Sequence, residues 1–244
     1  MPTPGVPQAG LSRPRRLLVV VAHPDDAEFG VAGSVARWVG EGTVAHLVCC
    51  TSGDGTGDDP STDPLQLAAR REREQRDAAA IVGYEDVSFL HRPDGAVAND
   101  LALREQLVRL IRAFRPDTVA TGDPRVLIHG WGAVNHVDHR EAGVAALDAV
   151  QPAAGNAMAF PALQRSEGLD PHVTRRLLLF WSEQPTHVVD ISDTLATKVR
   201  ALQAHASRRP ARGELAELVR AWARRDGASV GYEAGEAFSV VELA

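Results

Sequence analysis

The feature that most constrains the fold is a continuous apolar run at residues 17–22, Leu-Leu-Val-Val-Val-Ala, which stops at His23. An unbroken run rich in β-branched residues is typical of a strand that is buried on both faces, as in a parallel sheet. Asp25 and Asp26 follow the histidine at the point where the chain must turn. Burying such groups without partners is costly, so something at the end of this strand must compensate them.

The rest of the chain alternates between strand-like and helix-like segments. Strands are expected at 17–22, 43–50, 86–90, 118–121, 176–182 and 186–190. Helices are expected at 28–41, 65–82, 101–114, 137–150 and 193–207. This alternation predicts an α/β fold with a Rossmann-like, doubly wound, mostly parallel sheet flanked by helices. Ligands bind beyond the carboxyl ends of the strands in such a sheet, so the loops there should share one rim.

Composition narrows the class of protein. The chain has 244 residues, 24% of them charged, and a net charge of −6, which gives no basic surface for nucleic acid or an anionic membrane. Cys49 and Cys50 are adjacent, so their side chains would point to opposite faces of a strand, and a disulfide framework is not expected. We expect a disordered lead-in at residues 1–16, a single domain at 17–244 and a cytoplasmic location, since no segment reads as a signal peptide or membrane span.

A second informative stretch is N-H-V-D-H-R at residues 135–140. The two stretches together supply three histidines and three aspartates, for which a metal is the economical explanation. A His and an Asp three residues apart on a turn can face one ion, and a distant His adds a third ligand; such a mixed set describes a catalytic zinc site. The groups left over match the base and the acid that hydrolysis at zinc requires.

The paired motifs resemble a known family. A-H-P-D-D-A-E at 22–28 and N-H-V-D-H-R-E-A-G at 135–143 look like the signature of the LmbE-like, or PIG-L, zinc-dependent de-N-acetylases. Weaker but collinear similarities extend the resemblance over most of the chain. They lie at 51–54, 70–83, 89–95, 190–207 and 233–238.

The resemblance implies roles for individual residues. The zinc ligands that it implies are His23, Asp26 and His139. Asp25 would be the general base on the zinc-bound water. His136 would protonate the amine or stabilise the oxyanion, with Asp138 orienting it.

Two further residues fall where the family contacts its sugar substrate. Asp94 could accept hydrogen bonds from sugar hydroxyls, and Arg71, with Arg70 as the neighbouring alternative, could hold a polar substituent. Two departures from the family pattern stand beside these matches. Val137 replaces a frequent proline without touching the ligands, and Arg208 replaces a usual glutamine, which counts against a role in the site for the segment around it.

The expected function is therefore a zinc-dependent amidohydrolase that removes an N-acetyl or other N-acyl group from an amino sugar or glycoside-like substrate. The expected partner is that small molecule, with no nucleic acid and no membrane; self-association and the native metal, which could be ferrous iron or cobalt, stay open. The alternatives are an amidase of mycothiol-type thiol conjugates and a non-catalytic sugar-binding relative. A two-metal hydrolase is disfavoured because Val134 stands where its H-x-H-x-D-H motif needs a histidine. Trp131 could stack on a sugar ring or pack inside the protein.

Overall fold

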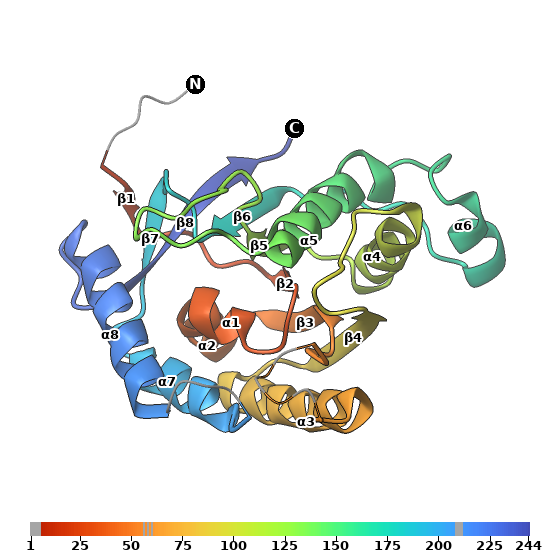
Figure 1. The fold of residues 1–244 in the computed structure, drawn as a ribbon. Coiled ribbons are helices and arrows are strands. Elements are labelled where there is room, and N and C mark those ends of the chain that lie inside the picture. Colours follow the sequence, from red (N-terminus) through yellow and green to blue (C-terminus); the bar gives the residue numbers. More distant parts are fainter. Residues whose placement is uncertain (1–5, 56, 58, 60, 208–211) are drawn as a thin grey trace.

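A computed structural model describes the chain except for residues 1–5, 56, 58, 60 and 208–211. Its described residues form one sheet in the order β1-β7-β8-β6-β5-β2-β3-β4, with helices on both faces (Figure 1). The strands are β1 (Gln8–Ala9), β2 (Arg16–Val21), β3 (Val44–Thr51), β4 (Asp86–Arg92), β5 (Thr118–Gly122), β6 (Arg176–Phe180), β7 (His187–Asp190) and β8 (Gly235–Glu242). The helices are α1 (Asp26–Gly30), α2 (Ala32–Gly40), α3 (Pro64–Val82), α4 (Leu101–Phe114), α5 (Val137–Asp148), α6 (Pro161–Glu167), α7 (Leu195–Ala204), α8 (Arg212–Ala228) and a π-helical turn, η1 (Ala149–Ala154).

Strand β2 lies in the interior of the sheet and pairs in parallel with both β3 and β5. Leu17 and Val19 point into a core that contains Trp38 of α2, whereas Leu18 lies in the opposite core with Leu107 of α4. The apolar run is therefore continuous because successive side chains enter two different cores. The prediction of a Rossmann-like, mostly parallel sheet is confirmed.

The strand order reverses between β2 and β5. The chain runs from β2 to β3 and β4 on one side, and then returns to place β5 on the other side of β2. In open α/β sheets, ligands bind at such a switch point, beyond the carboxyl ends of the strands. The turn after β2 and the long loop before α5 both leave from this point.

One expected helix is two helices. The segment 28–41 was predicted as one element, but the structure has α1 and α2, separated at Val31, whose φ of −140° is not helical. Gly30 lies directly against the Phe180 ring, where a Cβ atom would be 2.5 Å from a ring carbon. The short helix α1 thus packs closely on β6 and presents its first residue, Asp26, at the switch point.

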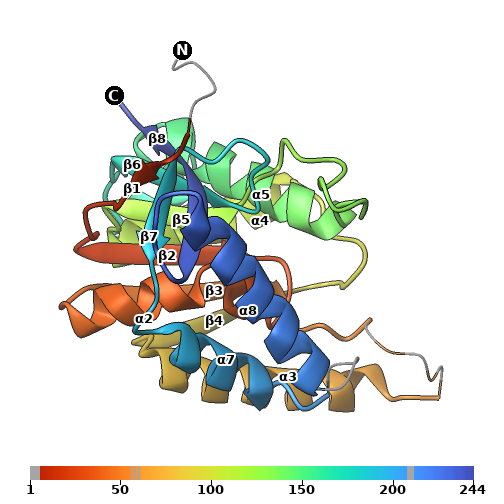
Figure 2. The same cartoon turned by 90° about the vertical axis from the view of Figure 1, so that its left-hand side faces the viewer.

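Two elements in the C-terminal part of the chain, α8 and β8, were not expected from the sequence. Neither were β1 and α6. Strand β8 runs antiparallel between β6 and β7, and α8 packs on β8 and α7 (Figure 2). Two polar residues, Glu236 and Ser239, interrupt the apolar pattern of β8, yet both are buried. In the segment expected to be a disordered lead-in, Gln8 and Ala9 pair with β7, and residues 1–5 lie outside the described part.

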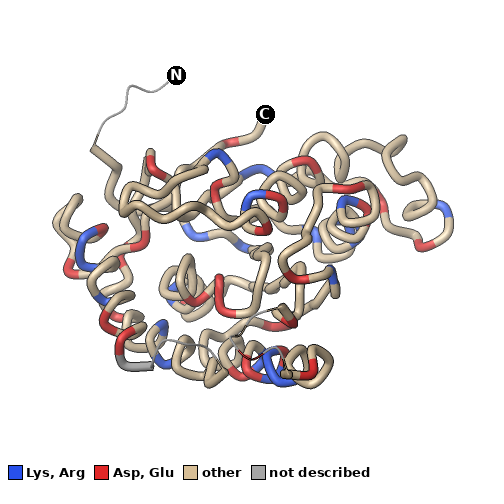
Figure 3. Tube along the Cα trace, in the orientation of Figure 1, with Lys and Arg blue, Asp and Glu red and all other residues tan. Residues whose placement is uncertain are grey.

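Charged residues are spread over the described elements rather than gathered on one face (Figure 3). Acidic side chains mark the start of α1, and both signs alternate along α3. Most charged residues of α3 are exposed, but Arg71 and Glu74 are buried. The neutral polar residue Gln75 is buried beside them. No helix among the described residues is both long and apolar enough to cross a membrane.

Candidate metal centre and active site

The predicted site residues lie together at the carboxyl edge of the sheet. His23 follows β2, Asp94 follows β4, and His136, Asp138 and His139 begin α5. The centroid of the His23 ring lies 5.1 Å from that of His139 and 5.2 Å from that of His136. Residues more than 110 positions apart in the sequence thus form one cluster at the switch point.

Two imidazole rings face the Asp26 carboxylate. Nδ1 of His23 lies 3.5 Å from Oδ2 of Asp26, and Nε2 of His139 lies 3.2 Å from Oδ1. Burial alone would raise the pKa of Asp26, but the His139 and His23 rings hold it well below its usual value. Asp26 is therefore an ionised carboxylate between two imidazole nitrogens, which is a suitable set of groups for holding a metal ion.

The other nitrogen of each ring is held by a side chain behind it. Nε2 of His23 lies 3.1 Å from both Asp94 and Asp138, and Nδ1 of His139 lies 3.1 Å from Oδ1 of Asn135. Histidines that bind a metal commonly hold their second nitrogen in this way, which fixes the tautomer and the direction of the ring. The residues present therefore fit a divalent metal ion bound by His23, Asp26 and His139, with ligand types suited to a catalytic site.

Electrostatics also favour a cation at this point. Burial lowers the pKa of His23, but Asp138, Asp26 and Asp94 together raise it to about 12. Three carboxylates around one ring make a site that prefers positive charge. Among the described residues, potential ligand atoms of His23, His136 and His139 lie within 4.8 Å of one another, as do those of His23, Asp94 and Asp138.

Asn135 was not predicted as a site residue, although it begins the second motif. It is buried, and its amide nitrogen donates to the Val126 carbonyl at 2.9 Å while its oxygen faces His139. We expect Asn135→Ala to weaken metal affinity about 10- to 100-fold, the usual effect of removing a group that orients a ligand. Competition titration with a chelator measures this; an unchanged affinity would show that His139 is oriented by other means.

Asp25 occupies a strained position next to the cluster. Its φ is 90°, a left-handed conformation that costs a non-glycine residue about 1–3 kcal/mol and often marks a functional site. Its side chain makes no capping hydrogen bond to α1, so it does not serve as an ordinary helix cap. It is 1% exposed, its backbone N–H donates to Gln75 at 2.8 Å, and its carboxylate lies 3.7 Å from the Arg71 guanidinium.

A buried hydrogen-bonded chain continues behind Asp25. Nε2 of Gln75 donates to Glu28 at 3.1 Å, and Nε2 of His205 lies 3.2 Å from the other oxygen of Glu28. The segment at His205 was expected to lie outside the site, and Arg208 itself lies outside the described residues. His205 is nevertheless buried and connected to Asp25 through two side chains. Glu28 ends the first motif and Gln75 lies in the resembling stretch at 70–83, but neither was predicted as a site residue.

This chain predicts a pH-dependent contribution to stability. Burial lowers the pKa of His205, but Glu28 raises it above its ordinary value overall. A raised pKa in the folded state stabilises the protein below the unfolded pKa of about 6.5, and the effect is lost as pH rises through the folded value. We expect His205→Gln to lower the melting temperature more at pH 6 than at pH 9, measured by thermal unfolding in chelator. An equal loss at both values would contradict a charged His205.

His136 and Asp138 lie differently from each other. Asp138 is fully buried and accepts the backbone N–H groups of Gly95 at 2.7 Å and Val97 at 3.1 Å. Its carboxylate is 3.1 Å from His23 but 3.9 Å from Nδ1 of His136, so of these two histidines the nearer one is the metal-ligand candidate. The side chain of His136 is 48% exposed at the mouth of the site. Burial and the neighbouring His23 lower the pKa of His136.

The two residues expected at the sugar differ in position. Asp94 lies in the site: it accepts the Gly55 backbone N–H at 3.0 Å and faces His23. Arg71 is only 3% exposed, and its guanidinium donates to the carbonyls of Pro24 at 2.8 Å and Gly53 at 3.1 Å. Arg71 thus joins the turn after β2 to the loop after β3, behind the mouth of the site. Arg70, the neighbouring alternative, is exposed on α3.

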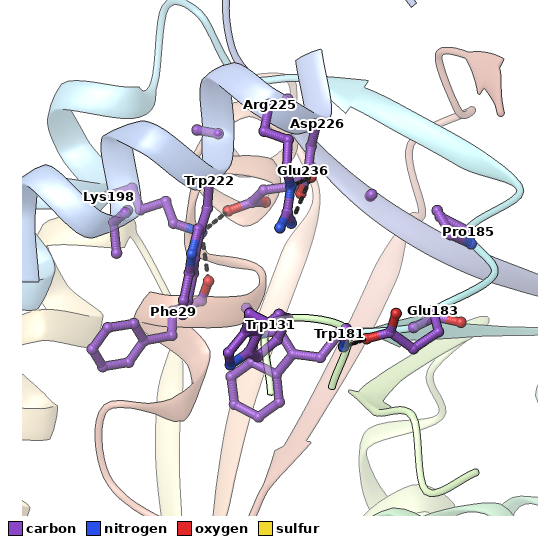
Figure 4. A pocket seen from close by; sticks show the side chains of 17 residues that line it. Phe29, Trp131, Trp181, Glu183, Pro185, Lys198, Trp222, Arg225, Asp226 and Glu236 are labelled. Carbon is purple, nitrogen blue, oxygen red and sulfur yellow. Dashed lines mark hydrogen bonds and ion pairs between the residues drawn. The ribbon is translucent and has the colours of Figure 1, made fainter. Parts of the chain in front are cut away.

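A cavity of about 310 Å³ opens beside His136 and His139. The residues of its apolar wall include Phe29, Trp131, Trp181, Leu215, Leu218 and Trp222. Trp131 stacks on the His129 ring, 4.1 Å away and tilted by 6°, and also lines the cavity. A second cavity of about 260 Å³ shares four of these aromatic residues (Figure 4).

A mostly parallel sheet with a His–Asp–His set and a buried carboxylate at its switch point fits a hydrolase with a candidate metal site. Residues 18–150 match the family described as PIG-L: GlcNAc-PI de-N-acetylase, which is more than half of the chain, and the chain belongs to this family. The family predicted from the paired motifs is therefore confirmed.

Individual relatives extend the similarity beyond the matched region. A diacetylchitobiose deacetylase of Thermococcus kodakarensis is 30% identical over 199 residues, which cover 80% of this chain and 71% of the relative. A 1D-myo-inositol 2-acetamido-2-deoxy-alpha-D-glucopyranoside deacetylase of Kineococcus radiotolerans is 28% identical over 254 residues, covering 81% and 70%. The structure of an N,N'-diacetylchitobiose deacetylase from Pyrococcus horikoshii aligns with a TM-score of 0.86 at 25% identity, covering 94% of this chain and 84% of that one.

Proposed function

We propose that this protein is a zinc-dependent amidohydrolase that removes an N-acetyl or other N-acyl group from an amino sugar or glycoside-like substrate. The observation that carries the proposal is the Asp26 carboxylate facing Nδ1 of His23 and Nε2 of His139, with the buried Asp25 beside it. The relatives named above are deacetylases of acetamido sugars, which supports the same reaction class for this chain.

The metal would be held by His23, Asp26 and His139, whose second contacts orient them for it. A bound zinc ion would polarise the amide carbonyl and lower the pKa of the attacking water. All three of these side chains are mostly buried, so solvent competes little with the ion for their atoms.

We assign Asp25 the role of taking the proton from the attacking water. Its backbone is fixed by Gln75 and its carboxylate lies beside Arg71, so the acceptor oxygens hold one position. A fixed carboxylate next to the reacting water is the geometry that general base catalysis requires. The strained φ of Asp25 is the local cost of this placement.

We assign His136 the role of giving a proton to the departing amine. It stands at the mouth of the site, 5.6 Å in ring-centroid distance from His139 and 5.2 Å from His23. An imidazole at this position can carry a proton to the departing amide nitrogen. Asp94, on the other edge of His23, has carboxylate oxygens able to accept hydrogen bonds from sugar hydroxyls.

The test is a substrate panel with primary-amine release as the readout. N-acetylglucosamine, N,N'-diacetylchitobiose and a mycothiol-type S-conjugate are incubated with the zinc-loaded protein. We expect amine release from the acetamido sugars. Release from the S-conjugate alone would favour the thiol-conjugate amidase, and no release from any member would favour a sugar-binding role.

A further inference from the structure

The cavity beside His136 and His139 has an apolar wall that amide hydrolysis of an acetyl group does not require. Phe29 of α1, Trp131 of the loop before α5, Trp181 after β6 and Trp222 of α8 surround it. The Trp181 ring lies 5.2 Å from the His139 ring, so this wall begins at the metal-ligand candidates themselves. Figure 4, which draws the second cavity, labels the same four aromatic side chains on their separate elements.

The cavity also has polar lining residues, and these are the candidate ligands Asp26 and His139 together with His129, Asn135 and His136. Asp94 contacts the Nε2 edge of His23, whereas Asp26, which faces the Nδ1 edge, borders the cavity. Asn135 also borders the cavity, but its side chain is engaged with Val126 and His139. A sugar ring buried among the indoles would leave hydroxyls without partners, which is unfavourable, while alkyl carbon buried there is stabilised.

The size of the cavity exceeds what an acetyl methyl group fills. An apolar cavity of about 150 Å³ holds a benzene molecule, and this cavity measures about 310 Å³. The second cavity, which shares Trp131 and Trp222, has a charged lining that includes Lys198 and Glu236. Lys198 and Glu236 form a buried ion pair (Figure 4), so an apolar chain should stop before them.

We propose that this cavity is an acyl pocket and that the natural substrate is an amino sugar whose N-acyl group is longer than acetyl, aliphatic or aromatic. This inference rests on the proposed amidohydrolase function and adds the acyl class to it. In the reaction the acyl C–N bond breaks and a C–O bond to the water oxygen forms. The water gives one proton to Asp25 and the amine nitrogen receives one from His136, so that a carboxylic acid and an amine leave.

The first experiment is an acyl series on one sugar. N-acetyl-, N-butanoyl-, N-hexanoyl- and N-octanoylglucosamine are compared by kcat/KM for amine release from the zinc-loaded protein. Each methylene that enters the pocket should raise kcat/KM about fourfold, from the free energy of burying a CH₂ group. A rate that falls steadily from acetyl to octanoyl, with acetyl hydrolysed, would overturn the acyl pocket and leave the deacetylase function standing.

A variant pair links the effect to the cavity. Leu218 lies on its rim at 40% exposure, and Leu218→Asp places a charge there; Leu101→Asp, at the exposed start of α4, is the matched control. We expect Leu218→Asp to bring the octanoyl-to-acetyl ratio of kcat/KM toward one and Leu101→Asp to keep the wild-type ratio. An unchanged ratio in Leu218→Asp would overturn the proposal.

Binding to the chelator-treated protein separates this inference from the proposed function. Isothermal titration should show tighter binding of N-octanoylglucosamine than of N-acetylglucosamine, with the difference lost in Leu218→Asp. That result without amine release from any substrate would support the pocket and contradict the hydrolase. Two results would overturn the pocket: a gain with the octyl glycoside of N-acetylglucosamine instead of the N-octanoyl sugar, or a wild-type dimer that Leu218→Asp dissociates in sedimentation velocity, which would assign the apolar wall to a second copy.

Discussion

Replacing Asp25 with asparagine will lower kcat for amide hydrolysis by about 10²- to 10⁴-fold, the range for loss of a general base, and the metal content of the protein will not change. The Asp25 carboxylate is buried beside Arg71. The carboxylate that faces both the His23 and the His139 rings is that of the neighbouring Asp26. Asparagine keeps the shape of the side chain and removes only its ability to accept a proton. Metal analysis and steady-state kinetics on the same preparation measure both quantities.

Asp193→Asn is the matched control, because Asp193 is exposed before α7 and changes by the same single atom. It should retain wild-type kcat. Two results would contradict the assignment: an Asp25→Asn variant with nearly full activity, or one that loses its metal, which would make Asp25 a ligand.

Replacing His139 with alanine will abolish metal binding at the site and activity with it. Nε2 of this residue is 3.2 Å from Asp26, and its removal leaves two protein ligands where a catalytic ion commonly uses three. The loss should exceed that of Asn135→Ala, which removes only the group that orients His139. Metal content after exhaustive dialysis, followed by reconstitution with excess zinc, measures the effect.

His187→Ala is the control, because His187 lies in β7, which is separated from β2 by β8, β6 and β5 in the sheet. This variant should keep one ion per chain. Circular dichroism of both variants establishes that each is folded. A folded His139→Ala protein with full metal content would show that a different group completes the site, with His136 the first candidate because its ligand atoms lie within 4.8 Å of those of His23.

The central fold and the site could be predicted because their signals are local. The apolar run before His23 needed a strand buried on both faces, and β2 is such a strand, with Val19 and Val20 in opposite cores. The strand–helix alternation then placed the loops after β2, β4 and β5 on one edge. His23 and His139 meet there, 5.1 Å apart in ring-centroid distance, across more than 110 residues of sequence.

The missed features depend on tertiary contacts that a pattern does not carry. The polar residues of β8 are buried because Glu236 accepts the backbone N–H groups of Gly33 and Ser34 and pairs with Lys198. No local rule marks such a strand as internal. The helical spacing of apolar residues in α8, by contrast, was present in the sequence and would have revealed the helix, though not that Trp222 reaches the site.

Arg71 and His205 show the same limit at the level of single residues. Arg71 stands in a run of alternating charges, and only the fold shows that its guanidinium binds two backbone carbonyls. His205 stands beside a departure from the family pattern, and only the packing of α7 on α1 brings it to Glu28. Position within the site, rather than residue type, decides what these side chains do.

The zinc site and its link to activity are tested together by zinc titration of the chelator-treated protein, with amine release from N-acylglucosamine followed at each step. A single catalytic zinc site predicts saturation at one zinc ion per chain, with activity rising in proportion to zinc bound and reaching its maximum at the same point. Full activity in the chelator-treated protein, or no zinc binding at the His23–Asp26–His139 site, would contradict it.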